Sequence, residues 1–137
     1  MNKYLVILMA TIYCSSAISG ALPLETMVTA ENADSLSVNL TKLHTGDDKT
    51  DLYQLAFPQK HENCVAGRVQ TFLLKDSDEV SSSSMDYKVG SVEPSILFHM
   101  QSSKYDMAVS LQYCCSEGFS PGCKKMLVIP SVRALVK

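Results

Sequence analysis

Cysteine is the residue type with the widest chemistry in this chain. The five cysteines stand at positions Cys14, Cys64, Cys114, Cys115 and Cys123. Their thiols form disulfides in the oxidising compartments of the secretory route, whereas in reducing compartments they bind metals or act as nucleophiles. The chemistry of these cysteines therefore depends on the cellular compartment, and the N-terminal residues indicate which compartment that is.

The N-terminal twenty residues follow the order of a secretory signal peptide. Lys3 supplies a positive charge, an uncharged and mostly apolar run follows, and small residues end the segment. The apolar run is too short to span a bilayer. We therefore predict a signal peptide over 1–20, cleaved after Ala17 or Gly20, and a mature protein secreted to the extracellular space. Cleavage also removes Cys14 and leaves an even number of cysteines.

The four remaining cysteines predict two disulfides. Adjacent cysteines rarely bond to each other, because the small ring strains the peptide between them. Cys115 continues the apolar face of an alternating strand, and Cys114 continues its polar face. We predict Cys64–Cys115 in the core and Cys114–Cys123 at the surface; the alternative set is Cys64–Cys114 with Cys115–Cys123. The core bond closes a loop of about fifty residues and would contribute roughly 4 kcal/mol.

Histidine and cysteine side chains together could also bind a zinc ion. His61-x-x-Cys64 could contribute to a Cys₃His ligand set, but the spacing matches no compact zinc module and export favours oxidised thiols. We expect no metal and no cofactor. The other two histidines are His44 and His99, and His99 lies on the polar face of its strand. The chain has no Gly-x-Ser-x-Gly, His-Glu-x-x-His or glycine-rich phosphate motif, so we predict that it is not an enzyme.

The segment between Cys115 and Cys123 is a candidate recognition loop. Its glycines and proline favour a turn, and the predicted disulfide would hold that turn before a partner binds, which lowers the entropy cost of binding. As a recognition loop it would present Glu117, Phe119 and Pro121 to a partner, with Phe119 as the aromatic anchor. The plainer interpretation, which we favour, is that Phe119 folds back over the end of the domain.

Two motifs mark candidate modification sites. Asn39-Leu40-Thr41 is an acceptor sequence for an N-linked glycan, and Asn39 falls on the polar face of its strand. Ser77-x-Glu79 lies in the acidic, serine-rich stretch 76–84 and could accept a phosphate. The plainer interpretation of 76–84 is a solvated polar loop.

Composition limits the partners and the number of domains. The chain has 14 acidic and 12 basic residues, and loss of Lys3 with the signal gives 14 against 11, a net charge of −3. Nucleic-acid binding requires a basic surface and is excluded. The length suits one domain. We expect an irregular lead-in over 21–35 and one β-rich domain over 36–137, monomeric and not inserted into a membrane.

Alternation of apolar and polar residues is the clearest structural signal. From Tyr105 to Tyr113 the apolar residues share one face of a strand, whereas they would scatter around a helix. The same kind of pattern predicts strands at 36–41, 53–57, 85–89 and 96–100. The β-branched and apolar residues of 65–75 predict another strand, and a final strand or pair is expected over 126–136, broken at Pro130.

These strands predict an all-β fold. We expect a small antiparallel β-sandwich of about seven or eight short strands with two disulfides; the alternative is a small open β-barrel. Tyr113-x-Cys115 with Cys64 upstream is compatible with immunoglobulin-like strand order. The chain has no tryptophan to complete that pattern, and we assign it to no family.

The function that fits these features is recognition of another protein. We expect a secreted, non-enzymatic binding or modulator protein that acts on an extracellular protein, in the manner of toxins, salivary proteins or immune modulators. This expectation rests on the class of small exported domains and on no particular site. The alternative is a structural component of an extracellular matrix, shell or coat, which the acidic serine stretch favours.

Overall fold

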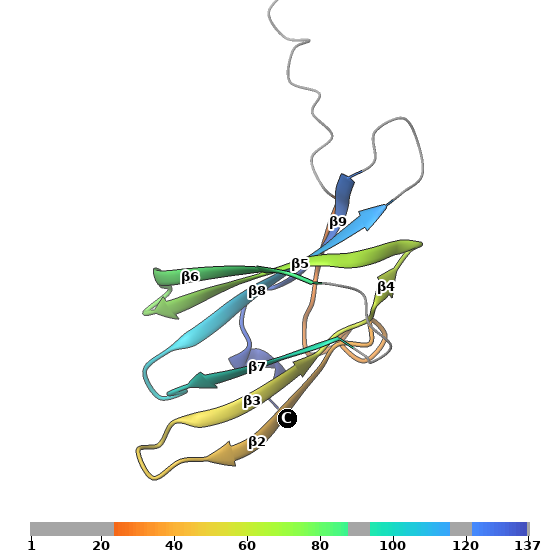
Figure 1. Ribbon diagram of the computed structural model, residues 1–137. Helices are drawn as coiled ribbons and strands as arrows, with labels where there is room; N and C mark the ends of the chain where they lie inside the picture. The colour runs from red at the N-terminus through yellow and green to blue at the C-terminus, as the bar shows by residue number, and fades with distance from the viewer. Residues whose placement is uncertain (1–23, 88–93, 116–121, 137) are drawn as a thin grey trace, which may run out of the picture.

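The computed structural model describes residues 24–87, 94–115 and 122–136, and it is nearly all β (Figure 1). The elements in chain order are β1 (Leu24–Met27), β2 (Asn39–Thr45), β3 (Asp51–Ala56), β4 (Lys60–His61), β5 (Cys64–Lys75), β6 (Asp78–Asp86), β7 (Ser95–Met100), β8 (Asp106–Cys115), β9 (Gly122–Ile129) and the 3₁₀ turn η1 (Arg133–Leu135).

The strands form two sheets. The larger has six strands in the order β1-β9-β8-β5-β4, with β6 pairing the same edge of β5 as β4 does, and the smaller has the order β2-β3-β7. The pairings are antiparallel except for β1 with β9. Both sheets curl, so that together they resemble a half barrel. The predicted all-β fold class is confirmed.

The core lies between the inner faces of the two sheets. Every second residue of β8 is buried there, and so is every second residue of β3 and the turn after it: Met107, Val109, Leu111, Tyr113, Tyr53, Leu55 and Phe57. Because strand side chains alternate between the two faces of a sheet, this burial follows directly from the sequence pattern. The strands predicted around 53–57, 65–75, 96–100 and 105–113 are confirmed.

The described part of the lead-in, residues 24–35, is more regular than predicted. Leu24–Met27 forms β1, and the turns that follow it cover one side of the core, where Ala33 and Val38 are buried. A strand of four residues is too short for an alternating pattern to appear, and its parallel pairing with β9 depends on a segment about a hundred residues away. The prediction of an irregular segment was therefore wrong for this part.

The stretch 76–84 is not a polar loop. Asp76 and Ser77 alone form the turn, with φ of 52° and 71°, as a two-residue type I′ hairpin requires. Asp78–Asp86 is β6, paired along β5. Every residue of β6 is exposed, so no apolar alternation marks it as a strand, and it is held in the sheet by its pairing with β5.

Two other strand predictions were misplaced. The strand expected at 36–41 begins at Asn39, because Ser37 has φ of 56° and belongs to a turn. The strand expected after Pro130 is the short turn η1, which buries Val132 and Leu135 against the core. Both segments bury apolar side chains, and an isolated apolar residue does not distinguish a turn from a strand.

Candidate functional site

The disulfide Cys64–Cys115 joins β5 to β8. Its Cα atoms lie 4.3 Å apart, and the two residues are 51 positions apart in sequence. Val65 and Cys114 are register partners, so the bond links neighbouring strands of one sheet. The structure thus contains the predicted pair and excludes Cys64–Cys114. It also differs from the immunoglobulin pattern, in which the disulfide joins two sheets.

The second disulfide remains a prediction. Cys114 and Cys123 are register partners across β8 and β9, and directly opposed residues of an antiparallel pair share one face of the sheet. This register favours a Cys114–Cys123 bond. The side chain of Cys123 lies outside the described part of the structure.

The zinc ligands that we considered are not assembled. Cys64 and Cys115 are oxidised to a disulfide and offer no thiolate. His61 is the register partner of Cys64 and its ring lies 5.5 Å from the ring of Tyr113. Within the described ranges, no three His, Cys, Asp or Glu side chains gather as a metal site.

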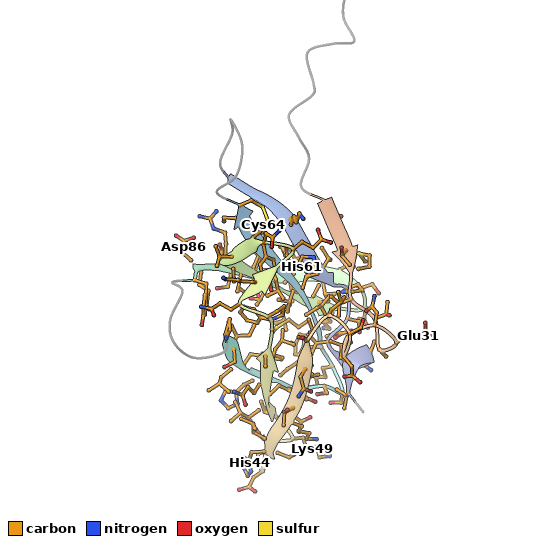
Figure 2. The ribbon with its side chains drawn as sticks, turned by 90° about the vertical axis from the view of Figure 1, so that its right-hand side faces the viewer. Glu31, His44, Lys49, His61, Cys64 and Asp86 are labelled. Atoms are coloured by element: carbon orange, nitrogen blue, oxygen red, sulfur yellow. A yellow bond between two sulfur atoms is a disulfide. The ribbon has the colours of Figure 1, made fainter. Side chains whose placement is uncertain are left out.

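The other two histidines lie in the smaller sheet. His44 and His99 are exposed and flank Leu52 in register on its outer face. Figure 2 shows His44 at one end of the molecule and His61 beside Cys64 toward the other. The predicted surface position of His99 is therefore found.

A polar cluster surrounds Asp51, which is buried at the start of β3. One carboxylate oxygen accepts hydrogen bonds from Thr45 Oγ1 at 2.7 Å and from Lys42 Nζ at 2.9 Å. The other accepts hydrogen bonds from Ser102 Oγ at 3.0 Å and from the Tyr53 hydroxyl at 3.2 Å. These donors stabilise the ionised form, foremost Thr45, and hold the pKa of Asp51 well below its usual range.

The Asp51 cluster joins three segments of the chain. Lys42 and Thr45 come from β2, Tyr53 from β3, and Ser102 from the turn between β7 and β8. The hydrogen bond from Lys42 to Asp51 also raises the pKa of Lys42. This cluster was not predicted from the sequence, because the strands expected at 36–41 and 53–57 do not reach Lys42, Thr45 or Asp51. Ser102 lies in a turn, where no alternating pattern marks its position. We interpret it as a structural network.

The structure describes both predicted modification residues, but not the predicted recognition residues. Asn39 is exposed at the first position of β2, on the outer face of the smaller sheet, and Ser77 is exposed in the β5–β6 turn. Both positions are accessible, and their modification remains a prediction. The recognition residues Glu117, Phe119 and Pro121 lie outside the described residues.

The outer face of the smaller sheet carries apolar side chains that sequence analysis did not single out. Leu97 in the middle of β7 is 63% exposed, Leu43 of β2 is 48% exposed, and Leu52 between them on β3 is half-buried. Leu97 occupies a position that the alternation assigns to the polar face of its strand. An apolar residue on a polar face was the available sequence signal for this surface.

No helix in the described part of the chain is long and apolar enough to cross a membrane. The chain matches no protein-family model, and no curated protein or solved structure is significantly similar to it.

Proposed function

We propose that this protein is a secreted, non-enzymatic binding protein that acts on an extracellular protein. The observation that supports the proposal is the outer face of the smaller sheet, where Leu97 is 63% exposed and Leu43 is 48% exposed. Contiguous apolar surface is typical of interaction sites, and Leu97 and Leu43 contribute exposed apolar side chains to this face. The disulfide Cys64–Cys115 supports an oxidising compartment.

The export part of the proposal has a direct test. The protein, expressed with its full sequence in a secreting host, should appear in the medium. N-terminal sequencing should then begin after Ala17 or Gly20, which are the two expected cleavage positions. Retention of the intact N-terminus inside the cell would contradict secretion.

The binding part can be tested by comparing two exposed apolar residues. Leu97→Ser removes an apolar side chain from the outer face of the smaller sheet. Val80→Ser is the matched control, because Val80 is 52% exposed and lies on β6 of the other sheet. Neither change should alter stability by more than about 0.5 kcal/mol, since both side chains are largely in solvent.

The measurement is covalent crosslinking in the extracellular fluid of the source, followed by affinity measurement with the purified crosslinked protein. We expect Leu97→Ser to weaken the affinity about tenfold or more, as loss of a central apolar contact does, and Val80→Ser to leave it unchanged. Equal affinity of all three proteins would contradict this docking face. Recovery of the protein in an insoluble matrix fraction would favour the structural alternative.

A further inference from the structure

Among the described strands, β7 pairs with β3 alone, so its other edge has no described strand partner. Free edges recruit other strands, and proteins usually protect them with short length, bulges, lysine or other charges. The other described free edges have such protection: β1 has four residues, β4 has two, β2 has Lys42 next to a bulge, and β6 has acidic residues at both ends and a bulge. In contrast, β7 has six residues without a charge or a bulge.

One hydrogen bond identifies the free backbone groups of β7. The amide of Phe57 donates to the carbonyl oxygen of Pro94 at 3.0 Å, so the backbone of Pro94 is directed toward β3. Backbone groups alternate in direction along an antiparallel strand, and every second residue after Pro94 therefore bonds to β3 as well. The residues between them direct their N–H and C=O groups to the free edge: Ser95, Leu97 and His99.

Beside this edge, part of the larger sheet is uncovered. Ser81, Ser83 and Met85 of β6 share a face with the core residues of β5, yet all three are exposed, and Met85 is 48% exposed. Strands β6 and β7 lie on the same side of the molecule (Figure 1). A pocket of about 180 Å³ opens between them, lined by residues that include Ser83, His99 and Met107.

We propose that an extended segment of the partner protein adds to β7 as a fourth strand of the smaller sheet. This inference rests on the proposed function and names the kind of partner that the binding protein would take. The segment bonds to the free N–H and C=O groups of Leu97 and His99. Its side chains on one face lie beneath β6, against Met85 and the pocket, and those on the other face lie beside Leu97. Apolar residues at every second position of the segment would all lie on the face toward Met85 and the pocket, and the positions between them would lie on the exposed outer face beside Leu97.

A second copy of the chain is the other candidate occupant of this edge, and the test below distinguishes it from a strand of a partner protein.

The test compares Leu97→Pro with Leu97→Ala. Both remove the leucine side chain, but only proline removes the N–H group, and at this position that group is not part of the ladder with β3. Edge strands accept proline at such positions. The probe is a set of linear nine-residue peptides, selected from a displayed random library on the wild-type protein and then synthesised.

We expect the selected peptides to carry apolar residues at alternate positions. Leu97→Pro should weaken their binding roughly three- to tenfold more than Leu97→Ala does, because it removes one backbone hydrogen bond. Amide hydrogen exchange of the wild-type protein gives an independent measurement: a bound peptide should slow exchange at Leu97 and His99, and leave Phe98, already bonded to β3, nearly unchanged.

Equal weakening by both variants would overturn strand addition and leave the proposed binding face intact. Unchanged exchange at Leu97 and His99 in the bound state would overturn it as well, whether or not Leu97→Pro folds. A concentration-dependent dimer that Leu97→Pro abolishes would identify a second copy as the occupant and contradict a partner strand.

Discussion

The two ends of β8 are held by different chemistry. At the C-terminal end, the Cys64–Cys115 disulfide joins β8 to β5, and the hydroxyl of the fully buried Tyr113 donates to the carbonyl of Pro58 at 2.7 Å. Near the N-terminal end, Ser102 and the residues around it are tied to the smaller sheet through Asp51. Figure 2 shows Cys64 and His44, the neighbour of Thr45, far apart along the molecule.

The stability of the two ends should therefore depend on different solution conditions. A covalent bond is indifferent to pH and salt, but requires an oxidising environment. The Asp51 cluster forms in any redox environment, but depends on an ionised carboxylate that accepts four hydrogen bonds. The two ends should therefore respond to different treatments.

Removal of the disulfide should have the largest effect. The double variant Cys64→Ser with Cys115→Ser releases a constraint between residues 51 positions apart, and the chain-entropy model predicts a loss of about 4 kcal/mol in the free energy of unfolding. Urea denaturation measures this loss. A loss below about 1 kcal/mol would show that the strand pairing of β5 and β8 suffices to hold this end.

Tyr113→Phe should have the next largest effect, at the same end of β8. It leaves the carbonyl of Pro58 without this donor, at a cost of about 1–3 kcal/mol. Burial raises the pKa of Tyr113, so the phenol remains protonated and able to donate at neutral pH. Tyr105→Phe is the control, since Tyr105 is only partly buried. Equal losses in the two variants would contradict a specific role for the Tyr113 hydroxyl.

The Asp51 cluster should make stability depend on pH. The pKa of Asp51 is lower in the folded chain than in the unfolded chain, so its stabilisation is complete above the unfolded pKa of about 4 and decreases as pH falls below that value. Asp51→Asn should flatten this part of the curve of unfolding free energy against pH. The disulfide variant should be less stable but keep the same slope.

Glu62→Gln is the matched control for that pH experiment. Lys125 pairs with Glu62 and lowers its pKa, but Glu62 is exposed and its ion pair is screened by solvent. We therefore expect a smaller change in slope than with Asp51→Asn. A larger change with Glu62→Gln would place the acid-sensitive group at the disulfide end and reverse the comparison.

Buried strands were predictable from their residues, and exposed ones were not. Leu111, Tyr113 and Cys115 stand at alternate positions, and this spacing predicted both the face of β8 and the partner of Cys64. Strand β6 was not predicted, because all nine of its residues are exposed. A strand without a buried face shows no alternation of apolar and polar residues. The burial of Asp51 was not predicted either. It depends on hydrogen bonds from Lys42 and Ser102, which are far apart from each other in the sequence.

Within the described chain, the sequence alone determined the β class, the buried faces of the central strands and the Cys64–Cys115 bond, since local alternation places side chains on one face or the other. The tertiary structure decided which strands pair, and so which edges remain free. Leu97 is exposed on an unprotected edge because the smaller sheet ends at β7. Where a sheet ends depends on long-range pairing, and the period of a single strand carries no information about it.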